Sequence, residues 1–144
     1  MAFGEAFLAG WSKNLRPTAG LVELITDVAS DHRLAIVSNT NDRCLVPSVL
    51  DSQGITAAFE QVTLSVEMGI RKPLWQIFEV TLERMGLTAT DAVFVGDSYE
   101  ADYLGARAAG LHSLLIDPDD RADVPASHRL RTIQDLRAAL SPTL

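Results

Sequence analysis

The sequence contains one cysteine, two lysines and no long hydrophobic run, and each of these shortages excludes a class of protein. Cys44 cannot form a disulfide within the chain, so nothing indicates an oxidising compartment. The apolar runs are too short to span a membrane, and the first residues lack the charged start and apolar core of a signal peptide. We therefore expect a soluble, cytoplasmic protein of one domain, for which 144 residues are enough.

Positive charge is scarce as well. Twelve Lys and Arg residues stand against nineteen Asp and Glu residues, which gives a net charge of −7. The arginines are scattered, and the lysines, Lys13 and Lys72, lie far apart in the sequence. Such a surface repels phosphate backbones and anionic lipids. We expect neither nucleic acid nor a membrane as a partner.

The hydrophobic pattern alternates between helices and short buried strands. Apolar residues at helical spacing predict helices that carry Leu21 to Val28, Leu45 to Leu50, Leu74 to Met85, Tyr99 to Ala109 and Ile133 to Leu140. Short apolar runs predict strands over residues 34–37, 61–65, 92–95 and 114–116. This order predicts an α/β fold with a Rossmann-like parallel sheet and helices on both faces.

Ligands of such sheets bind beyond the carboxyl ends of the strands. Ser38, Asn39 and Thr40 leave the first of these strands and offer hydroxyl, amide and backbone donors for an anion. The alternative interpretation is an ordinary strand-to-helix turn, where these residue types are common. Lys72, held by Pro73 at the start of a helix, opposes the helix dipole unless an anion is nearby; the alternative is a solvated surface lysine.

Asp97 directly follows the strand at residues 92–95, where a lone carboxylate is costly to desolvate unless it is paired or binds a metal. Asp102 lies about one helical turn further on, so both carboxylates can face one point. Oxygen ligands of this kind suit Mg²⁺, which usually keeps several waters and takes one or two carboxylates. The alternative is that Asp97 and Ser98 cap the following helix.

Taken together, these segments resemble the haloacid dehalogenase-like (HAD) hydrolase superfamily, over about Leu15 to Leu115. The resemblance lies in three ordered motifs: Ile36-Val37-Ser38-Asn39-Thr40, Ser65 to Pro73, and Val93 to Ser98 followed by Asp102 and Gly105 to Gly110. It implies that Ser38 and Asn39 bind phosphate, that Lys72 balances its charge, and that Asp97 and Asp102 hold Mg²⁺. The Gly96-Asp97-Ser98 form is similar to the phosphatases of the capped subgroup.

The first motif of that superfamily has no counterpart here. The resemblance implies an Asp-x-Asp at the end of the central strand, whose first Asp attacks phosphorus and forms an aspartyl phosphate. No aspartate precedes Asp27. We therefore expect a core that lacks its first, central strand and most of the helical cap. Phe3, Phe7, Leu8 and Trp11 lie at roughly helical spacing, so residues 1–16 resemble the tail of the cap, and we expect residues 17–144 to form the partial core.

Two consequences follow from that expected gap. The strands on either side of it would pair directly, borrow a strand or leave edges exposed. If these 144 residues are the whole molecule, we therefore expect self-association through exposed strand edges, or else poor stability. A coding region upstream of Met1 that supplies an Asp-x-Asp strand would indicate truncation; a stop codon would indicate a complete module. Asp117 and Asp119 also form an Asp-x-Asp after a strand, but Asp117-Pro118-Asp119-Asp120 is typical of a turn.

The preferred interpretation is a Mg²⁺-dependent phosphatase that acts on a small phosphorylated molecule through an aspartyl phosphate, and that is inactive as this chain alone. The alternative is a non-catalytic anion-binding or regulatory module with the same fold. A response-regulator-like receiver shares the general architecture, but the order of the motifs fits it poorly.

Overall fold

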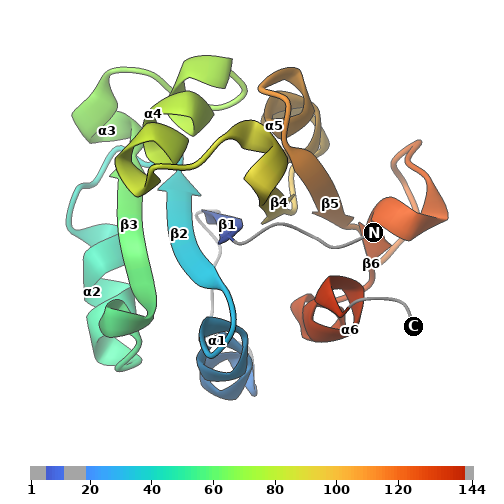
Figure 1. Ribbon diagram of the computed structural model, residues 1–144, viewed down its shortest axis with the longest axis horizontal. Helices are drawn as coiled ribbons and strands as arrows, with labels where there is room; N and C mark the ends of the chain where they lie inside the picture. Colours follow the sequence, from blue (N-terminus) through green and yellow to red (C-terminus); the bar gives the residue numbers. More distant parts are fainter. Residues whose placement is uncertain (1–5, 12–18, 142–144) are drawn as a thin grey trace.

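A six-stranded parallel sheet forms the centre of the computed structural model, which describes residues 6–11 and 19–141. The strand order is β3-β2-β1-β4-β5-β6 (Figure 1). The strands are β1 (Ala6–Trp11), β2 (Arg33–Ser38), β3 (Phe59–Leu64), β4 (Ala92–Gly96), β5 (His112–Ile116) and β6 (Arg129–Leu130). Every pair of neighbours is parallel, so the carboxyl ends of all strands lie at one edge of the sheet.

Helices cover both faces of the sheet, as the alternating pattern predicts. The α-helices are α1 (Leu21–Ala29), α2 (Leu45–Ser52), α3 (Ser65–Met68), α4 (Trp75–Met85), α5 (Gly105–Ala108) and α6 (Leu136–Leu140). Shorter helical segments are η1 (Thr56–Ala58), η2 (Ala89–Asp91), η3 (Tyr99–Leu104), η4 (Ala126–His128) and η5 (Ile133–Asp135). Helices α1, α2 and α6 pack on one face, and α4 and α5 on the other (Figure 1). The α/β class and the parallel sheet are confirmed.

Strands β2 and β4 are buried on both faces, and their side chains alternate between two hydrophobic clusters. Leu34 and Ile36 join the cluster beneath α1, whereas Ala35 and Val37 join the cluster beneath α4. This alternation follows from the two-residue period of a strand, and it explains why both strands read as continuous apolar runs. The carboxyl ends of β2 and β4, where the polar segments begin, are therefore anchored in the hydrophobic core.

The expectation of a gap at the centre of the sheet needs correction. Strand β1 lies between β2 and β4 and pairs with both, with Trp11 opposite Ser38 and Ala9 opposite Val95. Residues 6–11 are thus a strand and not the helix that the apolar spacing predicts. A short apolar run suits a buried strand as well as a helix, and strands on both sides supply hydrogen-bond partners for its backbone.

The other expectations about the amino-terminal segment are untested. Residues 1–5 and 12–16 of the predicted cap remnant lie outside the described residues, so the division of the chain at residue 16 stays a prediction. Self-association also stays a prediction, although the unfilled gap from which it was argued is not found. Among the described residues, no helix is long and apolar enough to cross a membrane; the cytoplasmic location stays a prediction.

Ion pairs tie the last helix to the first helix and the turn that follows it. Arg137 of α6 donates from Nη1 and Nη2 to the two carboxylate oxygens of Asp31, at 2.9 and 3.0 Å. Its Nε lies 2.9 Å from an oxygen of Asp27. The hydrogen bonds from Arg137, and then from His32, lower the pKa of Asp31 to about 2.

This pair predicts an acid-sensitive attachment of α6. A pKa lowered in the folded state stabilises the fold fully above the unfolded-state value of 3.8, and that contribution is lost as the pH falls through about 2. Arg137→Gln should therefore reduce the decline in stability between those two values, measured by urea unfolding at a series of pH values. Arg131→Gln, at an exposed position on the neighbouring turn, serves as the control. Its free energy of unfolding should fall with pH as steeply as that of the parent. The prediction would be contradicted if the free energy of unfolding fell equally steeply with pH in both variants.

Candidate active site

The three polar segments of the sequence meet at the carboxyl edge of the sheet, around the end of β1. Ser38 ends β2, Asp97 follows β4, and Lys72 lies between α3 and α4. The order of the strands reverses at this place: β2 lies on one side of β1 and β4 on the other, which is the switch point where α/β sheets bind ligands. The fold therefore brings the predicted site residues to the expected edge.

Lys72 is a buried cation, with only 4% of its surface exposed. Its Nζ donates to Oδ1 of Asp102 at 2.6 Å and lies 5.3 Å from the centre of the Phe94 ring. A buried lysine needs such partners, because an unpaired charge is very costly to remove from water. The alternative interpretation of Lys72 as a solvated surface lysine is wrong.

Asp102 is equally buried and uses both carboxylate oxygens within the protein. While Oδ1 accepts from Lys72, Oδ2 accepts from the backbone N–H groups of Asp97 and Ser98, at 3.1 and 3.0 Å. Gly96 makes this close approach possible, since a Cβ there would lie 2.2 Å from Oδ2 of Asp102. The Gly96-Asp97-Ser98 sequence is thus a turn that wraps around the Asp102 carboxylate.

The start of the following helix explains the spacing between Asp97 and Asp102. Ser98 caps it by accepting from the N–H of Ala101 at 3.1 Å, so the capping role of Ser98 is confirmed. The first part, η3, is a π-helical segment, and it carries Asp102 back under the strand end. The carboxylate of Asp97 is exposed, and within residues 6–11 and 19–141 it has no hydrogen bond or ion pair.

Asn39 joins the end of β2 to the Lys72 segment. Its Oδ1 accepts from the N–H of Lys72 at 2.8 Å, and its Nδ2 donates to the carbonyl of Lys72 at 2.9 Å. Ser38, one residue earlier, is 2% exposed at the last position of the strand. Asn39, Lys72 and Asp102 therefore form one connected chain of contacts that spans β2, the loop before α4, and η3.

The side chains at this edge meet only part of what Mg²⁺ requires. In the described part of the chain, no group of three or more His, Cys, Asp or Glu side chains could enclose a metal ion. Asp97 offers a carboxylate without other partners, whereas the oxygens of Asp102 are engaged. Because Mg²⁺ usually keeps several waters and takes only one or two carboxylates, Asp97 fits a site of that open kind.

Cavities near the surface adjoin some of the described residues. One, of about 450 Å³, adjoins Asp97 and extends past Tyr99 to the turn after β5. In that turn, the N–H groups of Ala122 and Arg121 bond to the Asp117 carboxylate and, with Arg129, hold its pKa below the usual range. The turn interpretation of residues 117–120 is therefore confirmed.

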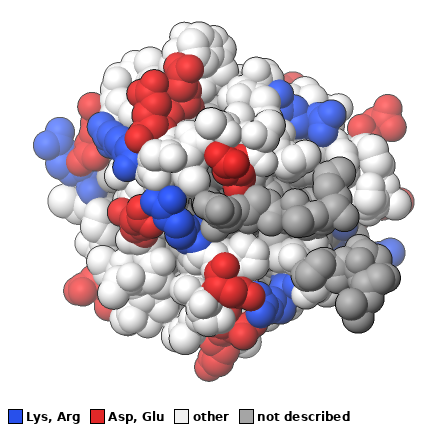
Figure 2. Space-filling model, in the orientation of Figure 1, with Lys and Arg blue, Asp and Glu red and all other residues white. Residues whose placement is uncertain are grey.

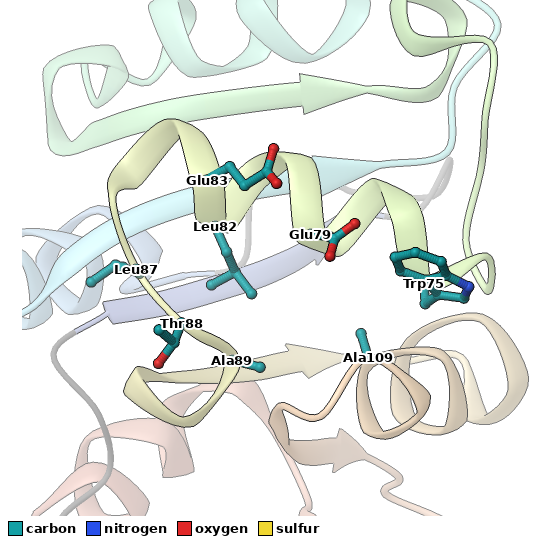
Figure 3. Close-up of a pocket in the computed structure, with 8 residues that line it drawn as sticks. All are labelled: Trp75, Glu79, Leu82, Glu83, Leu87, Thr88, Ala89 and Ala109. Atoms are coloured by element: carbon teal, nitrogen blue, oxygen red, sulfur yellow. The ribbon is translucent and has the colours of Figure 1, made fainter.

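Another cavity, of about 210 Å³, lies between α4 and the segment around η2, and it is lined by Trp75, Glu79, Leu82, Glu83, Leu87, Thr88, Ala89 and Ala109 (Figure 3). None of these residues belongs to the predicted site. On the face shown in Figure 2, basic side chains are scattered among acidic ones, and no basic patch is visible there.

Two contacts of the site were missed in the sequence analysis. The pairing of Lys72 with Asp102 joins residues 30 positions apart, and no local sequence pattern predicts it. The bonds of Asn39 to the Lys72 backbone are equally invisible in a single sequence. The glycines Gly96 and Gly105 were a usable signal of these long-range contacts. A Cβ at Gly105 would come within 2.9 Å of Pro73 Cα, and a Cβ at Gly96 would meet Asp102. Such glycines mark close approaches of the chain.

Comparison with known proteins places these features in a family. The profile of haloacid dehalogenase-like hydrolases matches residues 5–110. Haloacid dehalogenase-like hydrolase domain-containing protein 3 of Bos taurus is 35% identical over 114 residues, which cover 75% of this chain and 45% of the relative. Ribulose-1,5-bisphosphate 5-phosphatase of Halopiger xanaduensis is 30% identical over 128 residues, covering 88% of this chain and 53% of the relative.

A solved structure gives the same assignment. The magnesium-bound structure of the HAD-hydrolase YfnB of Bacillus subtilis is similar with a TM-score of 0.76 and 27% identity, over 85% of this chain and 54% of that one. The chain spans about half the length of the curated relatives that it matches. Because the family model matches residues 5–110 and the three motifs meet around Lys72, this chain belongs to the haloacid dehalogenase-like hydrolase family.

Proposed function

We propose that this chain carries the phosphate-binding and Mg²⁺-binding residues of a phosphatase that acts on a small phosphomonoester. The observation that carries the proposal is the buried Lys72, fixed between Asn39 and Asp102 at the carboxyl edge of the sheet. A lysine held at this edge, where β2 ends in Ser38, suits an incoming dianion. The phosphatase name of one relative supports the same class of substrate.

In the proposed site, Ser38 and Lys72 bind the phosphoryl oxygens. Lys72 is compensated by one carboxylate, Asp102, so an arriving phosphate adds negative charge to a locally balanced pair. We therefore propose that a second cation is needed before phosphate binds tightly. The exposed carboxylate of Asp97 would hold Mg²⁺, and Asp102 would position it by accepting from the backbone N–H of Asp97. When bound, Mg²⁺ supplies positive charge to the phosphoryl group.

The reaction that the family resemblance implies also needs a carboxylate nucleophile. That carboxylate would attack phosphorus, the bond to the leaving alcohol would break, and water would then hydrolyse the aspartyl phosphate. The sequence of β1, at the centre of the site, contains no acidic residue. We therefore propose that the 144-residue chain binds phosphate but does not turn over a phosphate ester by itself.

Asp97→Asn tests the binding proposal. The parent should bind inorganic phosphate more tightly when Mg²⁺ is present, and the variant should lose that enhancement, with binding in Mg²⁺ weakened roughly tenfold, as expected when one charge interaction is lost. Isothermal titration calorimetry with and without Mg²⁺ gives both values. Asp51→Asn, an exposed aspartate in α2, is the matched control and should behave like the parent. A parent that binds no phosphate would refute the proposal.

The absence of an acidic residue in β1 favours a second candidate, a non-catalytic anion-binding or regulatory module. The two candidates are separated by turnover of p-nitrophenyl phosphate. A module stays at the background rate under all conditions, including after addition of fragments that carry an Asp-x-Asp strand. Mg²⁺-dependent turnover by the chain alone, abolished by Asp97→Asn, would show that another group serves as the nucleophile.

A further inference from the structure

The side chain of Asn39 forms hydrogen bonds with the backbone of the segment between α3 and α4. Its two amide atoms make hydrogen bonds of 2.8 and 2.9 Å to the N–H and the carbonyl of the same residue, Lys72. Such a pair of bonds resembles the pairing of one strand residue with its neighbour. It fixes both the position and the orientation of the Lys72 backbone relative to the end of β2.

We infer that Asn39 is a positioning residue for Lys72 and acts on the anion through that lysine, not by direct contact with phosphate. This inference rests on the proposed function, since it refines the phosphate-binding role predicted for Asn39. The amide oxygen and one of the two amide hydrogens are engaged with the Lys72 backbone, so the side chain is held facing that segment, and only the second N–H of Nδ2 remains as a donor for a ligand. Lys72, in contrast, carries the charge that a phosphate requires.

The Lys72 segment depends on such a tie because it belongs to no helix or strand. It lies between α3, which ends at Met68, and α4, which begins at Trp75. A lysine side chain has four rotatable bonds and loses much entropy when it is held in one place. With Asn39 at the backbone and Asp102 at Nζ, both ends of Lys72 are held. Removal of the backbone tie should free the whole segment to move.

A second tie on the same loop provides a matched control. Ser65 Oγ accepts from the N–H of Thr40 and donates to the carbonyl of Thr40, at 3.0 Å in both cases. This is the same kind of side-chain clamp on a backbone, one residue beyond Asn39. It does not touch Lys72. Ser65→Ala therefore disturbs the loop to a similar degree without releasing the lysine.

The scarcity of lysine makes a direct test possible. The chain has only Lys13 and Lys72, so reductive methylation followed by peptide mass spectrometry reports on Lys72 with Lys13 as an internal reference. Methylation of Lys72 should be slow in the parent, because the side chain is buried. Asn39→Ala should speed it about tenfold, as expected for the loss of hydrogen bonds that hold a segment closed. Ser65→Ala should stay within about twofold of the parent.

Asn39→Asp provides the conservative variant. It keeps an acceptor for the Lys72 N–H but loses the donor to the carbonyl, so methylation should be intermediate between that of the parent and that of Asn39→Ala. Circular dichroism and thermal melting select conditions under which all variants are folded. The affinity for inorganic phosphate in Mg²⁺ is measured on the same samples and should fall about tenfold in Asn39→Ala.

The possible results separate the two roles of Asn39. Faster methylation together with weaker phosphate binding supports positioning. Unchanged methylation with weaker phosphate binding would overturn the inference and assign Asn39 to direct contact with the anion. If the parent binds no phosphate, the proposed function fails, but the methylation rates still decide whether Asn39 holds Lys72. Equal acceleration by Ser65→Ala would also overturn the inference, because general loosening of the loop would then explain it.

Discussion

Asp102→Asn is expected to lower the free energy of unfolding by about 3–5 kcal/mol, the usual cost of leaving one partner of a buried ion pair unpaired. One oxygen of Asp102 faces Nζ of Lys72 and the other faces two backbone N–H groups. Whichever way the new amide turns, its NH₂ group meets a donor. The Lys72 charge would stay buried without compensation. Urea unfolding measures the loss.

Two further variants make this result specific. Asp119→Asn removes a carboxylate from an exposed pair with Arg121, at 2.8 Å, and should cost only about 0–1 kcal/mol. Lys72→Met combined with Asp102→Asn removes both charges and should recover part of the loss, which a double-mutant cycle quantifies. If Asp102→Asn costs no more than Asp119→Asn, the buried pair does not exist in solution.

Gly96→Ala should destabilise the protein by about 3 kcal/mol or more, since the new methyl group has no room and the ion pair beside it must move. Its Cβ would lie 2.2, 2.4 and 2.5 Å from Oδ2, Cγ and Cβ of Asp102. Because Asp102 would be pushed away from Lys72, methylation of Lys72 should also become faster. Chemical unfolding and the methylation assay measure the two effects.

The control for Gly96→Ala is a glycine whose constraint is conformational instead of steric. Gly54 has a φ of 69°, and no atom lies within 4 Å of the position that an added methyl group would take, so Gly54→Ala should cost about 1 kcal/mol. Lys72 of this variant should be methylated at the parent rate. Similar losses for the two variants, with equal methylation, would show that Asp102 does not lie against Gly96.

Much of the fold could be predicted because its elements carry strong local signals. Helix α4 has its apolar residues at helical spacing and stops at Gly86, which adopts a φ of 68° that glycine tolerates best. Strands β2 and β4 are apolar runs that end in polar turns. Leu45 and Leu74 are exceptions: both fit the predicted apolar faces but are 41% and 49% exposed, because the spacing alone does not say where a buried face ends.

The centre of the sheet and the contacts of the site could not be predicted in the same way. The apolar residues of β1 satisfy both a helical and a strand pattern, and pairing with β2 and β4 is what distinguishes the two. Asp97 and Asp102 were predicted to face one point, but the partner that fixes the Asp102 side chain, Lys72, comes from a distant segment. Long-range pairing of this kind depends on the packed structure, and a single sequence contains no record of it.

The strand order has a consequence for how the protein reaches its working state. Strands β3, β2 and β1 come from the first 64 residues, and β4, β5 and β6 from residues 92–130, so the sheet consists of two contiguous halves that meet at one seam. Ser38, Asn39 and Lys72 belong to the first half of the chain, whereas Asp97 and Asp102 follow the seam strand β4. Neither half alone possesses the complete proposed anion site. Phosphate binding would therefore report late folding, when the two halves have joined, and it would stabilise that joined state selectively.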